Sequence, residues 1–276
     1  MNRSHTLAGI VLALALFSGQ ALAADIPPGA GQAKAALEKS PRHGEWAQIK
    51  VDGADKPMPA YVVYPERKDK APVVIVIMEI FGLSDWIRSV ADQLAADGFI
   101  AIAPDLIIGK GPDDDDNESL KSSDEAPRYV RELKPEEVIS RLNATRDYGK
   151  SLPASNGKTA TVGFCWGGGM SFLYATAQPD LNAAVVYYGT SPKTETLKNV
   201  KAPVLGNYGE NDARVDATID PAKQEMQSLG KTYEPHIYPG AGHGFLRQQD
   251  GQNGANLKAA QEAWPRTVAF LKEHTK

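Results

Sequence analysis

Cysteine is nearly absent from this chain: Cys165 is the single copy among 276 residues. One cysteine cannot form an internal disulfide, so no disulfide framework holds the fold. The hydrophobic share of 42% and the charged share of 23% are ordinary for a globular protein and suffice for a full core. The sequence therefore predicts a chain that folds by burying apolar side chains.

An apolar run long enough to span a membrane is missing as well. The stretch Leu7–Phe17 is apolar, but it falls short of the roughly 18 residues that a transmembrane helix needs. Arg3 precedes it and Ala21–Ala23 follows it, which is the pattern of a secretory signal peptide. We predict a signal peptide over residues 1–23, cleavage after Ala23, and a secreted or periplasmic protein with no stable membrane anchor. A retained transmembrane anchor is the alternative.

An excess of positive charge is also absent. The chain has 30 Lys and Arg against 34 Asp and Glu. Removal of residues 1–23 takes away Arg3 and no acid, which leaves 29 − 34 = −5. A mildly acidic surface argues against nucleic acid as the partner.

Short apolar runs rich in β-branched residues alternate with helical segments along the chain. An antiparallel edge pair is predicted from Trp46–Val51 and Ala60–Tyr64, which alternate in polarity. Further strands are predicted at Pro72–Met78, Phe99–Ala103, Thr159–Val162, Ala183–Tyr188, Val204–Tyr208 and Tyr233–Tyr238. Helices are predicted at residues 85–97, 135–150, 166–177, 217–229 and 255–274. This order predicts an α/β fold with a mostly parallel central sheet and helices on both faces.

Neither an internal repeat nor a linker interrupts this alternation, so we predict a single domain over residues 24–276. Residues 24–44 are predicted to form a mobile arm with a short helix near Gln32–Lys39. A polar insertion at residues 109–125 holds the acidic block Asp113–Asp116. A cation site is one interpretation, because hard cations take clustered oxygens, but a solvated insertion is favoured, because blocks of like charge are usually disordered.

The stretch Gly163–Gly169 follows one predicted strand and precedes an apolar helix. Gly163 and Gly167 lie two positions before and two positions after Cys165, which is the small-x-nucleophile-x-small pattern of a nucleophile elbow with cysteine at the nucleophile position. The positive end of the following helix is expected to lower the pKa of the thiol, and the N–H of Trp166 is expected to face a forming oxyanion. An unpaired thiol in an exported protein is a liability unless it is buried or used. The alternative is a glycine-rich turn around a buried structural cysteine.

A nucleophilic cysteine needs a base, and the base needs an acid to orient it. His243 lies in a glycine-dense loop after the last predicted strand, at the sheet edge where ligands bind in such folds. Asp212 follows the preceding strand and falls between the cysteine and the histidine in chain order, as is typical of this fold class. Glu210 and Asp216 are its local rivals, and a plain turn cap is the alternative role for Asp212.

An acidic residue, Glu79, directly follows the predicted strand Pro72–Met78 and should reach the same sheet edge as Cys165. Burial of an unpaired carboxylate is costly, so Glu79 is predicted to have a partner or to be protonated. The next residue, Ile80, is placed to supply a second N–H to the oxyanion hole.

Five motifs occur in chain order, and they are Glu79–Gly82, Gly163–Gly168, Val186–Gly189, Gly209–Asp212 and Gly242–Arg247. Together they resemble the dienelactone hydrolase family, the carboxymethylenebutenolidases, over the chain from about Trp46 onward. The resemblance implies an α/β-hydrolase fold and a catalytic triad of Cys165, His243 and Asp212.

The resemblance also implies roles for residues around the triad. The acid at Glu79 takes the thiol proton once substrate is bound, and Arg247 binds the substrate carboxylate. A second arginine is expected before the elbow, with Arg128 and Arg131 both open because the acidic insertion blurs the match. Trp166 stands where the family often has a smaller apolar residue, which leaves the substrate open.

These residues predict hydrolysis of a small-molecule lactone or carboxylic ester through an acyl-thioester intermediate. The N–H groups of Ile80 and Trp166 would hold the oxyanion, and the chemistry calls for no metal and no organic cofactor. Two alternatives stay open: a broad carboxylesterase for small esters, and a non-catalytic periplasmic binding protein on a hydrolase scaffold. Alkylation of Cys165 by iodoacetamide no faster than that of a denatured thiol, together with no hydrolysis across a lactone panel, would favour the binder.

Overall fold

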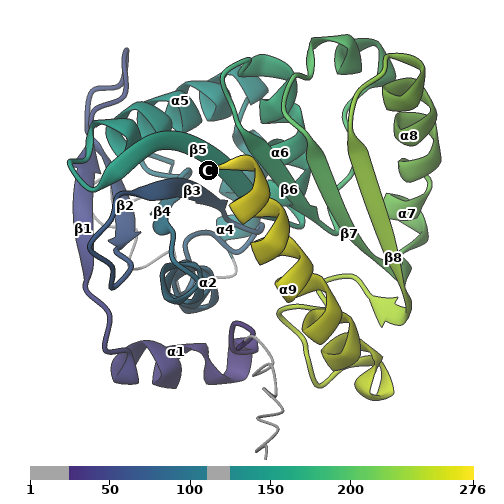
Figure 1. The fold of residues 1–276 in the computed structure, drawn as a ribbon, viewed down its shortest axis with the longest axis horizontal. Helices are drawn as coiled ribbons and strands as arrows, with labels where there is room; N and C mark the ends of the chain where they lie inside the picture. The colour runs from purple at the N-terminus through teal and green to yellow at the C-terminus, as the bar shows by residue number, and fades with distance from the viewer. Residues whose placement is uncertain (1–24, 111–124) are drawn as a thin grey trace, which may run out of the picture.

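The fold is built on a central sheet (Figure 1). The computed structural model describes residues 25–110 and 125–276, and within them the sheet has eight strands. They lie side by side in the order β1 (Gly44–Ile49), β2 (Met58–Val63), β4 (Ile100–Pro104), β3 (Ala71–Ile77), β5 (Ser155–Phe164), β6 (Ala183–Tyr187), β7 (Val204–Asn211) and β8 (Tyr233–Gly242). The pairs β1–β2 and β2–β4 are antiparallel, and every pair from β4 to β8 is parallel. The predicted mostly parallel sheet with an antiparallel edge is confirmed.

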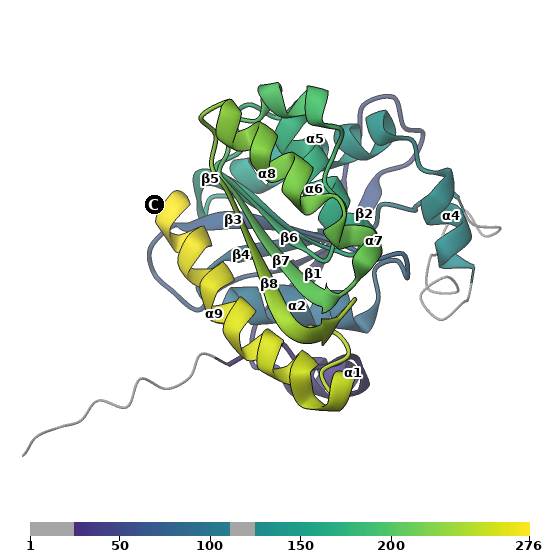
Figure 2. The ribbon, with the colours of Figure 1, turned by 90° about the vertical axis from the view of Figure 1, so that its right-hand side faces the viewer.

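Helices cover both faces of the sheet (Figure 2). On one face lie α2 (Asp85–Ala96) and α9 (Ala255–His274), with α1 (Ala30–Lys39) packed against α2. On the other face lie α5 (Pro135–Ser151), α6 (Trp166–Ala177) and α8 (Ile219–Ser228). Shorter elements complete the chain, and they are α4 (Ala126–Glu132), η1 (Thr194–Asn199), α7 (Ala213–Asp216) and η2 (Gln252–Gly254).

The centre of the sheet explains why its strands read as continuous apolar runs. All seven residues of β3 and all five of β4 are buried, because helices cover both of their faces. Each large apolar side chain buried in this way contributes about 1.5–3 kcal/mol relative to an exposed one. The next helix, α2, begins after Ser84, whose hydroxyl accepts the N–H of Ile87 at 3.4 Å. This cap fixes the start of α2, the helix that follows the loop after Glu79.

Three strands run further than the sequence predicts, and the first of them, β5, spans Ser155–Phe164 in place of the predicted Thr159–Val162. β7 continues to Asn211 and β8 to Gly242, and these two residues pair with each other across a register shift. Glycines at the ends of β7 and β8 weaken the sequence signal for a strand. Pairing with the neighbouring strand nevertheless holds these residues in extended conformation. The extra pairing fixes the relative positions of Asp212 and His243, each of which follows the last residue of its strand.

The predicted mobile arm is wrong for the residues that the structure describes. Residues 30–39 form α1, which packs against α2 and buries Ala33 to 1% exposure. The short helix predicted inside the arm is present and begins two residues earlier than expected. Alanine and glycine give α1 little hydrophobic pattern, so its tertiary contact is invisible in the local sequence.

Part of the chain lies outside the described residues. It includes the predicted signal peptide at residues 1–23 and most of the predicted acidic insertion at residues 109–125. Among the helices of the described part, none is long and apolar enough to cross a bilayer.

Candidate active site

Four parallel strands deliver the predicted catalytic side chains to one edge of the sheet. Cys165 directly follows β5, Asp212 follows β7 and His243 follows β8, while Glu79 comes two residues after β3. The strands β3, β5, β6, β7 and β8 are consecutive neighbours and all parallel. Their carboxyl ends therefore line one edge, which is where ligands bind in open α/β sheets.

Cys165 sits on a strained turn between β5 and α6. Its φ of 55° and ψ of −117° lie in a region that non-glycine residues rarely adopt and that costs about 1–3 kcal/mol. The turn is so tight that a Cβ on Gly163 would lie 1.9 Å from the carbonyl oxygen of Gly167. A Cβ on Gly167 would lie 2.3 Å from the carbonyl oxygen of Met78. The glycines thus allow the strained backbone that presents the sulfur at the sheet edge.

The surroundings of the Cys165 thiol favour its protonated form. Burial raises the pKa of the half-buried thiol, and the charge of Glu79 raises it further. The backbone N–H groups of Trp166 and Ile80 favour the thiolate, but they do not reverse the direction. The expectation of a lowered thiol pKa is therefore wrong. Both expected oxyanion donors nevertheless lie close enough to influence the sulfur.

His243 and Asp212 form a close pair at the ends of β8 and β7. The Nδ1 atom of His243 lies 2.5 Å from Oδ2 of Asp212, which is 8% exposed. This contact leaves Nε2 as the nitrogen that can exchange a proton with another group. Of the two local rivals, Glu210 accepts the backbone N–H of Gly240 at 2.8 Å. Among the described residues, the ion pair of His243 is with Asp212 and not with Asp216.

Buried Glu79 has a partly exposed cationic partner. The carboxyl is 2% exposed, and its Oε2 lies 2.9 Å from Nε of Arg247. The two atoms form an ion pair without hydrogen-bond alignment, so each lacks a hydrogen-bond partner among the described residues. Burial raises the pKa of Glu79 to about 7, although the positive charge of Arg247 lowers it. The Arg247 guanidinium also lies 4.8 Å from the ring centre of Phe81, which is 42% exposed.

Two further residues border this site and were missed in the sequence. Tyr188 has a φ of 41°, and its buried hydroxyl has no hydrogen-bond partner among the described residues. Its ring centre lies 5.2 Å from that of His243. Arg214 is exposed, and its charge lowers the pKa of Cys165. The position of Arg214, two residues after Asp212, is a signal that could have been used, whereas the unusual φ of Tyr188 leaves no local trace.

The second arginine expected near the substrate stays open. The helix α4, which carries Arg128 and Arg131, begins beside the loop that follows Glu79: a Cβ on Gly82 would lie 3.8 Å from the Cβ of Ala126. Arg128 is exposed and lies 3.4 Å from a carboxylate oxygen of Glu132. The helix thus reaches the rim of the site, but these contacts assign neither arginine to it.

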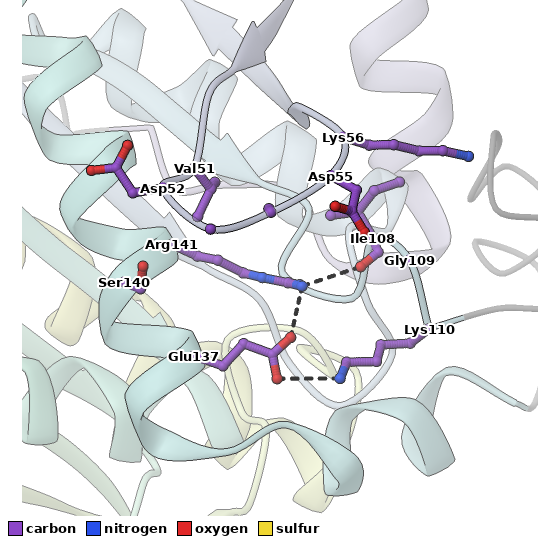
Figure 3. Close-up of a pocket in the computed structure, with 12 residues that line it drawn as sticks. Val51, Asp52, Asp55, Lys56, Ile108, Gly109, Lys110, Glu137, Ser140 and Arg141 are labelled. Atoms are coloured by element: carbon purple, nitrogen blue, oxygen red, sulfur yellow. Dashed lines mark hydrogen bonds and ion pairs between the residues drawn. The ribbon is translucent and has the colours of Figure 1, made fainter.

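A separate hollow of about 560 Å³ lies between the β1–β2 connection, the segment after β4 and the start of α5 (Figure 3). Arg141 donates to the carbonyl oxygens of Leu106 and Ile108 and to the Glu137 carboxylate at 2.7 Å. Lys110 completes the cluster with a 3.2 Å ion pair to Glu137 (Figure 3). Both cations are already paired with the Glu137 carboxylate, so the hollow offers less chemistry than the sheet edge.

The sheet edge holds groups suited to covalent acyl transfer. It combines a sulfur on a strained turn, a carboxyl with a pKa of about 7, a cation and an imidazole–carboxylate pair. Within residues 25–110 and 125–276, no group of three or more His, Cys, Asp and Glu side chains is placed to hold a metal ion.

Comparison with known proteins gives matches over most of the chain. Residues 58–275 match the family model described as "Dienelactone hydrolase family". A Salmonella typhimurium protein named "Putative carboxymethylenebutenolidase" is 34% identical, over 79% of this chain and 83% of its own length. A Methylorubrum extorquens protein of the same name is 31% identical, over 96% of this chain and 92% of its own length.

A solved structure agrees with these sequence matches. The crystal structure described as "Putative Dienelactone Hydrolase" from Klebsiella pneumoniae aligns with a TM-score of 0.73 and 30% identity. The alignment covers 84% of this chain and 99% of that one. The family match, the relatives and the shared fold lead to one conclusion: this chain is a hydrolase that belongs to the dienelactone hydrolase family.

Proposed function

We propose that this chain hydrolyses small lactones or carboxylic esters that carry a carboxylate, through an acyl-thioester on Cys165. The observation that carries the proposal is the ion pair of buried Glu79 with partly exposed Arg247, at the same sheet edge as the thiol. A substrate carboxylate that binds Arg247 competes with Glu79 for the cation. Binding therefore frees a base next to the nucleophile.

The resting site is a neutral thiol beside a paired carboxylate. Burial and the charge of Glu79 keep the Cys165 pKa raised, which slows reaction with oxidants because the thiolate is the reactive form. This property suits an exported protein. The pattern of residues 1–23 supports secretion or export to the periplasm, with a mature chain that starts after Ala23.

Acylation begins when the substrate carboxylate pairs with Arg247. Without its cation, Glu79 has a still higher pKa, so the carboxylate takes the proton from the Cys165 sulfur. The thiolate attacks the carbonyl carbon, and the carbonyl electron pair moves to oxygen, where the N–H groups of Ile80 and Trp166 stabilise it. Loss of one such donor typically costs about 2.7–4 kcal/mol of barrier.

Collapse of this intermediate breaks the bond to the leaving oxygen, which takes the proton that Glu79 removed from the thiol; for a lactone, the ring opens and the alcohol stays attached. Deacylation then uses the second half of the site. His243, oriented by the 2.5 Å contact with Asp212, takes a proton from water, and the hydroxide attacks the thioester. The sulfur leaves as thiolate and takes the proton that His243 removed from water, which returns both Cys165 and His243 to their resting forms.

Replacement of Arg247 tests the substrate class. We expect Arg247→Ala to lower kcat/KM about 10- to 100-fold for an unsaturated lactone with a pendant carboxylate, because a charged hydrogen-bonded contact contributes about 1.5–3 kcal/mol. The matched lactone with a neutral primary amide should lose far less. An effect on Glu79 should lower kcat/KM for both lactones alike. The ratio of kcat/KM for the carboxylate lactone to that for the amide lactone therefore reports carboxylate recognition alone.

The control for this comparison is Arg67→Ala, which removes an exposed arginine whose side chain donates to the carbonyl oxygen of Gly98. It should leave the ratio unchanged. Equal losses on the carboxylate and the amide substrate in Arg247→Ala would rule out a carboxylate-binding role and favour a broad carboxylesterase.

A further inference from the structure

The N-terminal segment is tied to the body of the protein along its length. The indole N–H of Trp86 in α2 donates to the carbonyl oxygen of Pro28 at 3.1 Å. Ala33 is buried at 1% exposure, and the Ser40 hydroxyl donates to Asp92 of α2 at 2.6 Å. The segment is thus an ordered layer outside α2 (Figures 1 and 2).

The same segment also reaches the loop that carries Arg247. The backbone N–H of Ala30 donates to the carbonyl oxygen of Arg247 at 2.9 Å. The side-chain amide of Gln249 donates to the carbonyl oxygens of Pro27 at 2.8 Å and Leu246 at 3.0 Å. Gln249 therefore joins the N-terminal segment to the turn on which Arg247 sits.

This contact is made by few atoms. A cavity of about 450 Å³ lies between the start of α1 and residues 247–250. Beside this hollow, the hydrogen bonds from Ala30 and Gln249 join the two segments and restrain the loop. The family match begins at Met58, so the N-terminal segment precedes the matched region.

The position of the Arg247 backbone determines where its charged guanidinium lies. The guanidinium is fixed by Phe81 on one side and by the 2.9 Å contact with Glu79 on the other. The Coulomb energy of the pair varies inversely with its separation, and burial of Glu79 reduces the screening by water. A small movement of the loop would therefore change how Arg247 meets both Glu79 and a substrate carboxylate.

We propose that the segment Ile26–Ala30 is a strap that positions Arg247 for substrate, with Gln249 as the positioning residue that fastens it. Affinity for carboxylate-bearing substrates then depends on a part of the chain that contributes no group to the chemistry. The inference rests on the proposed function, because it needs Arg247 to bind the substrate carboxylate.

The test is Gln249→Ala in the mature chain, which removes both side-chain hydrogen bonds and keeps the strap. We expect KM for the carboxylate lactone to rise about tenfold, consistent with the loss of neutral hydrogen bonds, and kcat to change less than about twofold. KM for the amide lactone should not change. The control is Gln248→Ala, which alters the adjacent exposed residue and should match wild type with both substrates.

A pH profile supplies a readout that a purely structural role would not move. Arg247 lowers the pKa of Glu79, so a displaced Arg247 raises that pKa. The acid limb of kcat/KM, near pH 7 in wild type, should therefore move to higher pH in Gln249→Ala and stay in place in Gln248→Ala.

The Arg247→Ala variant distinguishes the two proposals. If it discriminates between the carboxylate and amide lactones while Gln249→Ala matches Gln248→Ala in KM and pH profile, the strap is overturned and the proposed function stands. Equal effects of Gln249→Ala on both substrates, with a lowered unfolding midpoint, would also overturn it. If Arg247→Ala does not discriminate, the proposed function and the strap fall together.

Discussion

Cys165→Ala should abolish lactone hydrolysis while leaving the fold intact. We expect kcat to fall about 10⁴-fold or more, as is typical when the nucleophile of a catalytic triad is removed. The side chain is small and only half-buried, so the free energy of unfolding should change by less than about 1 kcal/mol. Steady-state kinetics on the carboxylate lactone and urea denaturation of the same preparations check both expectations.

Cys165→Ser is the matched variant, since it keeps the shape of the side chain and changes only the acidity of its proton. A hydroxyl is a far weaker acid than a thiol, so Glu79 with a pKa of about 7 cannot deprotonate it readily. Lactone turnover should therefore also collapse. Retained turnover in Cys165→Ala would remove the sulfur from the mechanism, and faster hydrolysis of simple esters by Cys165→Ser would favour the broad carboxylesterase.

Glu79→Gln should make the protein more stable at pH 8 and much less active. In the folded state burial raises the pKa of Glu79 from its ordinary 4.5 to about 7. Between these two pH values the folded chain holds a proton that the unfolded chain has lost, so the stability of wild type falls as pH rises. A pKa of about 7 in place of 4.5 corresponds to about 3 kcal/mol.

Glutamine mimics the protonated carboxyl and cannot lose that proton. Glu79→Gln should therefore match wild type near pH 4 and gain up to about 3 kcal/mol at pH 8, as measured by urea denaturation. Turnover should fall about 10²–10⁴-fold, the usual contribution of a positioned base. The exposed Glu38→Gln should change neither quantity. A variant that is less stable than wild type at pH 8 would show that the ion pair with Arg247 outweighs the cost of burying the charge.

The sheet could be predicted because its signal is local. The continuous apolar runs of β3 and β4 have no reading other than strands covered on both faces, and their order along the chain sets a parallel sheet. The placement of α1 could not be predicted, because its contact with α2 depends on small residues that give no periodic pattern. The extension of β7 to Asn211 was hidden for a related reason: it depends on pairing with Gly242.

The site could be predicted in its residue types and less well in its electrostatics. Chain order selects Asp212 and His243, and the 2.5 Å contact separates Asp212 from Glu210 and Asp216. The sequence demands a partner for a buried Glu79, but only the folded chain brings Arg247 to it, 168 positions later. The raised pKa of the Cys165 thiol comes from burial and from the charge of Glu79 in the loop after β3, which the motif around Cys165 does not report.

The most direct measurement of the acyl-thioester is the intact mass of His243→Ala after mixing with the carboxylate lactone. His243 serves deacylation in the proposed mechanism, so this variant should accumulate one substrate mass per chain and lose its only free thiol. Peptide mapping should place the added mass on Cys165. An unmodified Cys165 in this variant, under conditions where wild type turns over the same lactone, would contradict a covalent route through the sulfur.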